Sequence, residues 1–183
     1  MKFTTKPLVA MALLSAIAFV IAHYFHLLAI PVVPAAPYLT LDLKDAVIII
    51  GGFLYGPLAV VMMSAVVSVA EMPFSGTHWV GLVMNMLSTC AFGCTASFIY
   101  RRKKDFANAI IGVISGCVVM TIVMLPANWL LTPFYIPISR EVVAQMLLPI
   151  ILPFNLIKGT VNAVLIAVFY KPFMFVFTKS NRE

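Results

Sequence analysis

Charged residues are scarce in this sequence of 183 residues. Asp, Glu, Lys and Arg together make up 10% of it, whereas apolar residues make up 63% and the mean hydropathy is +1.08. A soluble globular domain carries about 25% charged residues, so the composition excludes that class. It predicts an integral membrane protein in which residues 1–183 form a single transmembrane domain, nearly all of it within the bilayer.

Acidic residues are the scarcer of the two charge types. There are 6 of them against 12 Lys and Arg, which gives a formal net charge of +6. The basic residues are scattered over short segments between apolar runs, so we expect no nucleic-acid partner. The excess instead indicates how the chain is oriented, because cytoplasmic loops of membrane proteins are enriched in Lys and Arg.

Motifs of the common catalytic sites are absent. The chain contains no G-x-x-x-x-G-K-[ST], so it does not hydrolyse ATP with a P-loop, and it contains neither H-E-x-x-H nor G-x-S-x-G. Its cysteines, Cys90, Cys94 and Cys117, lie inside apolar segments, where we expect neither a disulfide nor a metal site. The sequence therefore predicts no catalytic residues and argues against an intramembrane enzyme.

Long apolar runs, by contrast, are abundant. They cover Leu8–Ile30, Ala46–Ala70, Trp79–Tyr100, Ala107–Leu131 and Met146–Phe177. The second run is interrupted by Gly51–Pro57 and could form one crossing or two. Only two crossings place Arg101–Lys104 on the same side as Lys2 and Lys6, as the positive-inside rule requires. We therefore predict six transmembrane helices with both termini in the cytoplasm.

Prolines mark two departures from simple crossings. The segment Pro31–Lys44 is rich in proline and mostly apolar, so we expect it to fold back over the outer side of the protein as a lid. The last apolar run would be about 48 Å long as one helix, which exceeds the bilayer. A late start or a break near Pro149 and Pro153 is therefore expected.

The most informative residue is a lysine inside the last apolar run, Lys158. A lysine at the bilayer centre costs at least about 3 kcal/mol, so it usually faces the protein interior and has partners there. Asn155 and Asn162 lie three and four residues away on the same helix face. One interpretation is a polar seam that joins helices. The other is a binding site for a polar ligand inside the membrane.

Depth favours the binding site. Measured from the inner ends of their helices, Lys158 lies about 20 Å deep, Asn155 and Asn85 about 24 Å, and Asn128 about 34 Å. Glu71 and the lid lie on the same outer side. Amides and one ammonium, with aromatic residues nearby, suit a flat heterocycle that bears hydroxyl groups, either neutral or anionic, rather than a cation.

Four motifs spread over nearly the whole chain point to a known family. They are Pro34-Ala35-Ala36-Pro37-Tyr38-Leu39-x-Leu41-Asp42-x-x-Asp45, Gly52-Phe53-x-x-Gly56-Pro57, Asn128-Trp129 and Pro153-Phe154-Asn155-Leu156-Ile157-Lys158-Gly159. With them the sequence resembles the riboflavin-specific substrate-binding (S) components of energy-coupling factor (ECF) transporters. The resemblance implies six helices, a ligand site near the outer surface covered by the first loop, and riboflavin as the transported ligand, with FMN as an alternative.

The resemblance also implies roles for individual residues. Together with Glu71 and Asn85 from the depth argument, the expected ligand contacts are Tyr38, Leu39, Thr40, Asn128, Asn155 and Lys158. Ala12 and Ala16 match the small-residue motif with which the first helix docks on a scaffold. The implied partners are a membrane scaffold (T) subunit and two ABC-type ATPases, in the plasma membrane of a bacterium. No catalytic cofactor is implied.

Two alternatives in transport stay open at this point. An S component for another vitamin, such as thiamine or folate, would share the fold. A stand-alone secondary transporter would usually need a buried acid for proton coupling, and no carboxylate lies within an apolar run of this sequence.

Overall fold

The computed structural model describes residues 5–28, 39, 42–74, 78–134 and 136–180, and every regular element within these ranges is a helix. The helices are α1 (Thr5–Leu28), α2 (Lys44–Tyr55), α3 (Pro57–Glu71), α4 (His78–Tyr100), α5 (Phe106–Leu131), α6 (Arg140–Met146) and α7 (Leu152–Ser180). A 3-10 turn, Thr132–Phe134, follows α5, and a π-helix, Leu147–Ile151, joins α6 to α7. The all-helical class predicted from the sequence is confirmed.

Six helical segments make up the bundle, because α6, the π-helix and α7 follow one another without a gap. Four segments are long and apolar enough to cross a membrane: Thr5–Tyr24, Trp79–Tyr100, Phe106–Phe134 and Arg140–Phe175. The other two, α2 and α3, have 12 and 15 residues. They are the two short helices that the interrupted apolar run predicted.

The break between α2 and α3 is a hinge at Gly56. This glycine has φ +97°, a conformation that residues with a side chain rarely adopt. Its N–H donates to the carbonyl of Gly52 at 2.7 Å, which closes the last turn of α2. Pro57 then occupies the first position of α3, where a missing N–H costs nothing. The Gly-Pro pair therefore reverses the chain direction within one residue.

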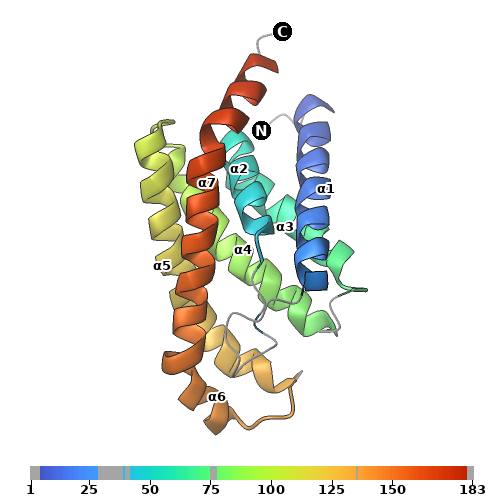
Figure 1. Cartoon of the computed structure of the whole chain (residues 1–183), viewed down its shortest axis with the longest axis vertical. Coiled ribbons are helices and arrows are strands. Elements are labelled where there is room, and N and C mark those ends of the chain that lie inside the picture. Colours follow the sequence, from blue (N-terminus) through green and yellow to red (C-terminus); the bar gives the residue numbers. More distant parts are fainter. Residues whose placement is uncertain (1–4, 29–38, 40–41, 75–77, 135, 181–183) are drawn as a thin grey trace.

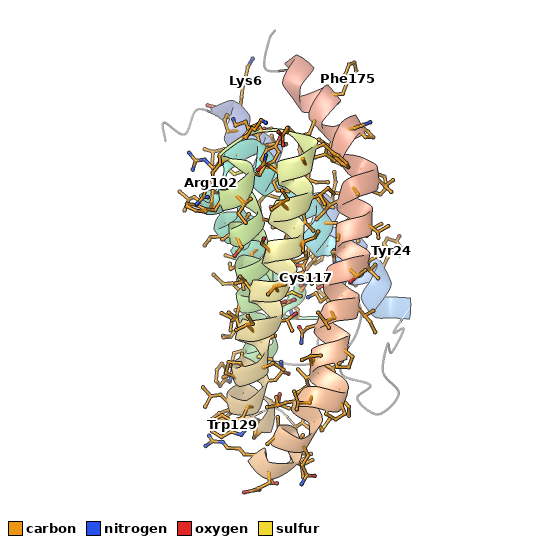
Figure 2. The ribbon with its side chains drawn as sticks, turned by 90° about the vertical axis from the view of Figure 1, so that its left-hand side faces the viewer. Lys6, Tyr24, Arg102, Cys117, Trp129 and Phe175 are labelled. Atoms are coloured by element: carbon orange, nitrogen blue, oxygen red, sulfur yellow. The ribbon has the colours of Figure 1, made fainter. Side chains whose placement is uncertain are left out.

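Both ends of the chain approach the same end of the bundle. The start of α1, the end of α7 and the turn between α4 and α5 lie together, whereas α6 lies at the opposite end (Figure 1). Figure 2 shows Lys6, Arg102 and Phe175 near the first end and Trp129 near the second. The first end, which carries the Arg101–Lys104 turn, is called the basic end below. This arrangement agrees with an even number of crossings.

Helix α2 lies inside the bundle rather than on its surface. It packs against α1, α3, α4 and α7, and its first ten residues, from Lys44 to Phe53, are all buried. An apolar residue such as Ile48, Ile49 or Ile50 suits that position on any face. The burial extends to the two charged residues that begin the helix, Lys44 and Asp45, and these residues create the site described below.

Glycines allow the helices around the site to approach closely. A Cβ at Gly112 of α5 would lie 2.6 Å from the carbonyl oxygen of Ala96 in α4. A Cβ at Gly159 of α7 would collide with Sγ of Cys117 in α5. Gly159 follows Lys158 directly, so this contact brings the lysine-bearing turn of α7 close against its neighbour.

The helix formed by the last apolar run widens at Pro149 and is not interrupted there. The π-helix Leu147–Ile151 contains Pro149, which lacks the N–H that a regular turn would use. The helical path nevertheless continues into α7. The late start or break predicted near Pro149 and Pro153 is therefore wrong, because the π-helix accommodates Pro149 without interrupting the helical path.

A buried charge cluster as the candidate functional site

Five charged side chains meet where α2, α3, α4 and α7 come together. They are the carboxylates of Asp42, Asp45 and Glu71 and the ammonium groups of Lys44 and Lys158. Between 0% and 16% of each side chain is exposed. Charges with so little access to water are costly unless they are paired. Three acids and two bases leave this cluster with one excess negative charge when all are ionised.

Lys158 is paired with Asp45. Its Nζ lies 3.0 Å from Asp45 Oδ2 and donates a long hydrogen bond of 3.4 Å to Oγ of Ser88. The other carboxylate oxygen, Asp45 Oδ1, accepts a hydrogen bond of 2.6 Å from Oγ1 of Thr89. Asp45 Oδ2 receives no hydrogen bond from the described residues, so its contact with Nζ is an ion pair without hydrogen-bond geometry. Asp45 thus links α2 to both α4 and α7.

Lys44 joins the start of α2 to the end of α3. Its Nζ lies 2.8 Å from Asp42 Oδ2 and also pairs with Glu71 Oε2. That same oxygen of Glu71 accepts a hydrogen bond of 3.0 Å from Nδ2 of Asn85 in α4. The ammonium of Lys44 is therefore shared by two carboxylates, and the chain Asp42–Lys44–Glu71–Asn85 ties three elements together.

Asn162 fastens the start of α2 to α7. Its Nδ2 donates to the carbonyl oxygens of Asp42 and Lys158, both at 3.0 Å, and its Oδ1 accepts from the N–H of Ala46 at 2.9 Å. The N–H of Ala46 belongs to the first turn of α2, where backbone donors have no partner within the helix. The amide thereby satisfies a helix terminus and holds Asp45 beside Lys158.

The predicted ligand residues divide into two groups. Glu71 and Lys158 belong to the charge cluster and Asn85 donates to it through Glu71, and their contact with a ligand stays a prediction. Asn155 lies one turn before Lys158 and is buried, and its Nδ2 donates to its own helix at the carbonyl of Ile151 at 2.7 Å. Asn128 is also buried, and its Nδ2 donates to Met124 O at 2.8 Å. The described hydrogen bonds of both asparagines are local.

Of the predicted lid contacts, Leu39 is described and Tyr38 and Thr40 lie outside the described residues. Leu39 is buried in an apolar cluster with Val143, Ile151 and Phe154. Phe154 precedes Asn155, so Leu39 packs beside the turn that carries a predicted ligand residue.

Ala12 and Ala16, the predicted docking residues, are exposed on α1. The opposite face of the same helix packs into the bundle through Met11, Leu14 and Ala18. The two alanines are therefore available to a neighbour without disturbing the core.

Sequence reasoning missed Asp45. Asp45 was placed between the lid, Pro31–Lys44, and the apolar run that begins at Ala46, and no buried carboxylate was expected. The structure shows that this expectation was wrong, because Asp45 is fully buried. Sequence reasoning also missed Lys44, Thr89 and the partners of Asn162. The spacing Asp42-x-x-Asp45 before a continuous apolar helix was the available signal, since a helix buried on all faces also buries its first charged residues.

The cluster offers groups that can bind a polar molecule. Within the part of the chain that the structure describes, no group of three or more His, Cys, Asp or Glu side chains is placed to hold a metal ion. The groups present are hydrogen-bond donors and acceptors held in fixed positions by one another. Such an arrangement recognises a polar molecule by complementary hydrogen bonds.

Comparisons with known proteins agree in sequence and in structure. Residues 6–170 match the family described as "ECF transporter, substrate-specific component". The protein called "Riboflavin transporter RibU" in Staphylococcus aureus (strain TCH60) is 36% identical over 172 residues, which cover 91% of this chain and 89% of that relative. "Riboflavin transporter FmnP" of Bacillus subtilis (strain 168) is 30% identical over 175 residues, with 90% of each chain covered.

A solved structure described as "Structure and mechanism of the S component of a bacterial ECF transporter" superposes with a TM-score of 0.79 and 31% sequence identity. The superposition covers 94% of this chain and 97% of that one. The match therefore extends over nearly the whole of both chains. This chain belongs to the substrate-specific components of ECF transporters.

Proposed function

We propose that this chain binds riboflavin at the outer side of a bacterial plasma membrane and delivers it inward as the S component of an ATP-driven importer. Support comes from the family membership and from two relatives named as riboflavin transporters, each covering about nine tenths of the chain. Within the chain, the observation that carries the proposal is the buried Lys158, which has an ion-pair partner and unused hydrogen-bonding capacity.

The orientation follows from charge. The basic end, with Arg101–Lys104 and Lys6, is placed in the cytoplasm by the positive-inside rule. The charge cluster then lies in the outer half of the protein, because Lys44 begins α2 and Glu71 ends α3, on the side away from the basic end. Both termini are cytoplasmic in this arrangement, and the first loop acts as a lid on the outer side.

The ligand chemistry suits a flavin. Its ring carbonyls and nitrogens accept hydrogen bonds, and its ribityl chain both donates and accepts. Lys158, Asn155 and Asn128 supply donors, Glu71 and Asn85 can meet hydroxyl groups, and the lid residues Tyr38, Leu39 and Thr40 close over the ring.

One observation argues against the stand-alone secondary transporter. Proton coupling needs an acid that can take up and release a proton. Asp45 is buried, and both of its carboxylate oxygens are engaged within the protein, Oδ2 by the ammonium of Lys158 and Oδ1 by the hydroxyl of Thr89. We assign ATP hydrolysis to two ABC-type ATPases and their docking to a membrane scaffold subunit that contacts Ala12 and Ala16.

Purified wild-type chain is expected to quench the fluorescence of added riboflavin at a 1:1 ratio, and Lys158→Met is expected to raise the dissociation constant about 5- to 150-fold. The loss corresponds to about 1–3 kcal/mol for buried acceptors left without a donor. Titration with riboflavin, FMN, thiamine and folate measures the preference directly. Wild-type chain that binds thiamine or folate but not riboflavin would reassign the vitamin. Unchanged riboflavin affinity in Lys158→Met would remove Lys158 from the site.

A further inference from the structure

We propose that Asp45 is a positioning residue of the ligand site: its buried carboxylate balances the charge of Lys158 and fixes the ammonium so that the remaining Nζ–H donors face the ligand. The inference rests on the proposed function, because Lys158 is the expected ligand contact. In this proposal Asp45 affects ligand binding by positioning Lys158 and does not itself contact the ligand.

Asp45 is held firmly from two sides. Thr89 donates to its Oδ1 at 2.6 Å, a distance typical of a hydrogen bond from a hydroxyl group to a carboxylate. The backbone on either side is fastened by Asn162, which bonds to the carbonyl of Asp42 and to the N–H of Ala46. The carboxylate therefore has a fixed position relative to α7, and its two oxygens are directed to Thr89 and Lys158.

Lys158, in contrast, is held loosely by hydrogen bonds. An ammonium group has three N–H donors. Its described partners are Ser88 Oγ at 3.4 Å and Asp45 Oδ2, which lies 3.0 Å away outside hydrogen-bond geometry. The attraction of Asp45 thus determines where the ammonium sits, while most of its directional hydrogen bonding is left for another molecule.

The other charges of the cluster do not replace Asp45. Lys44 engages Asp42 and Glu71, so these two carboxylates are already partnered. Removing the charge of Asp45 would leave Lys158 as a buried cation without an ion pair, which is strongly unfavourable. The ammonium would then move toward other oxygens, and the ligand would lose its donor.

A double-mutant cycle on riboflavin affinity tests the role. Asp45→Asn keeps the shape of the side chain and an oxygen that can accept from Thr89, but removes the charge. We expect Asp45→Asn and Lys158→Met each to raise the dissociation constant at least about tenfold. The double variant is expected to match Lys158→Met within about threefold, because Asp45 acts through Lys158. A general loss of stability would instead weaken binding in both backgrounds.

Asp105→Asn provides the control, since Asp105 is a carboxylate that pairs with Lys103 at the basic end, away from the cluster. It should change the dissociation constant by the same factor in the wild-type and Lys158→Met backgrounds. The positioning role would be overturned if the double variant lost affinity by the product of the two single losses. Wild-type affinity in Asp45→Asn alone would also overturn it.

Failure of the proposed function is distinguishable from failure of this inference. Wild-type chain that does not bind riboflavin would contradict the function. The wild-type chain and the three variants of the cycle are then compared by thermal unfolding without ligand. Asp45→Asn is expected to lower the unfolding midpoint in the wild-type background and to raise it in Lys158→Met, where it removes an unpaired buried carboxylate. Equal shifts in both backgrounds would contradict the pairing itself.

Discussion

Replacing Ala12 and Ala16 together by tryptophan is expected to abolish riboflavin uptake by cells while leaving riboflavin binding by the purified chain unchanged. Small residues spaced four apart let two helices approach to backbone contact, and an indole at either position prevents this approach. Both alanines are exposed on α1, so the substitutions add bulk outside the bundle. They do not touch the charge cluster, which is formed by α2, α3, α4 and α7.

Uptake is measured with labelled riboflavin in cells that also produce the scaffold subunit and the two ATPases, and binding is measured by fluorescence quenching in detergent. The matched control is Val164→Trp with Val168→Trp on α7. These two residues are also exposed and also four apart, but on a helix face with no small-residue motif, so uptake should persist. Loss of binding together with uptake in the alanine variant would mean that Ala12 and Ala16 serve the fold.

The helical framework could be predicted from the sequence because its signals are local. Apolar runs set the helices, and Gly56 with Pro57 set the hinge between α2 and α3, since glycine alone adopts φ +97° readily. Pro149 located the irregular turn of the last run but not its form. A missing N–H can be accommodated by a break or by a π-helix, and packing around the turn decides between them.

The partners in the site could not be predicted in the same way. Lys158 could be identified from the sequence because a lysine inside an apolar run is energetically unfavourable. Its counter-ion, Asp45, lies 113 residues earlier in the chain. The periodicity of a helix relates only residues that are a few positions apart, so it does not identify an ion pair between residues this far apart in the sequence. Asp45 also stands at the boundary between a loop and an apolar helix, where a carboxylate is ordinarily exposed. Only the central position of α2 shows that this boundary is buried.

The position of α2 also explains why the cluster contains more charges than a ligand would need. A helix that begins inside a bundle leaves backbone N–H groups without water, and here Asn162 satisfies the N–H of Ala46. The acids and bases around it neutralise one another in two sets, Asp45 with Lys158 and Asp42 and Glu71 with Lys44. The ammonium of the first set has one carboxylate partner, and the ammonium of the second set has two. We therefore assign the main ligand donor to the first set and a mainly structural role to Lys44 in the second.

Lys44→Met is accordingly expected to act mainly on stability. The substitution removes a side chain that is 1% exposed and leaves the carboxylates of Asp42 and Glu71, themselves mostly buried, facing one another without a cation. Removing one partner of a buried ion pair costs about 3–5 kcal/mol. For a chain of this size, we expect the thermal unfolding midpoint in detergent to fall by roughly 10 °C. Fluorescence of Trp79 and Trp129 can follow the transition.

Two variants separate this explanation from a general intolerance of substitution. Lys103→Met makes the same change in an ion pair at the basic end, where Lys103 and Asp105 are 78% and 36% exposed and 3.4 Å apart, so the midpoint should not change measurably. Adding Glu71→Gln to Lys44→Met removes one of the two stranded charges and keeps an oxygen that can accept from Asn85, so part of the loss should be recovered. A double variant less stable than Lys44→Met alone would show that repulsion between Asp42 and Glu71 is not the cause. The role of Lys44 would then lie in the packing of its alkyl chain against the start of α2.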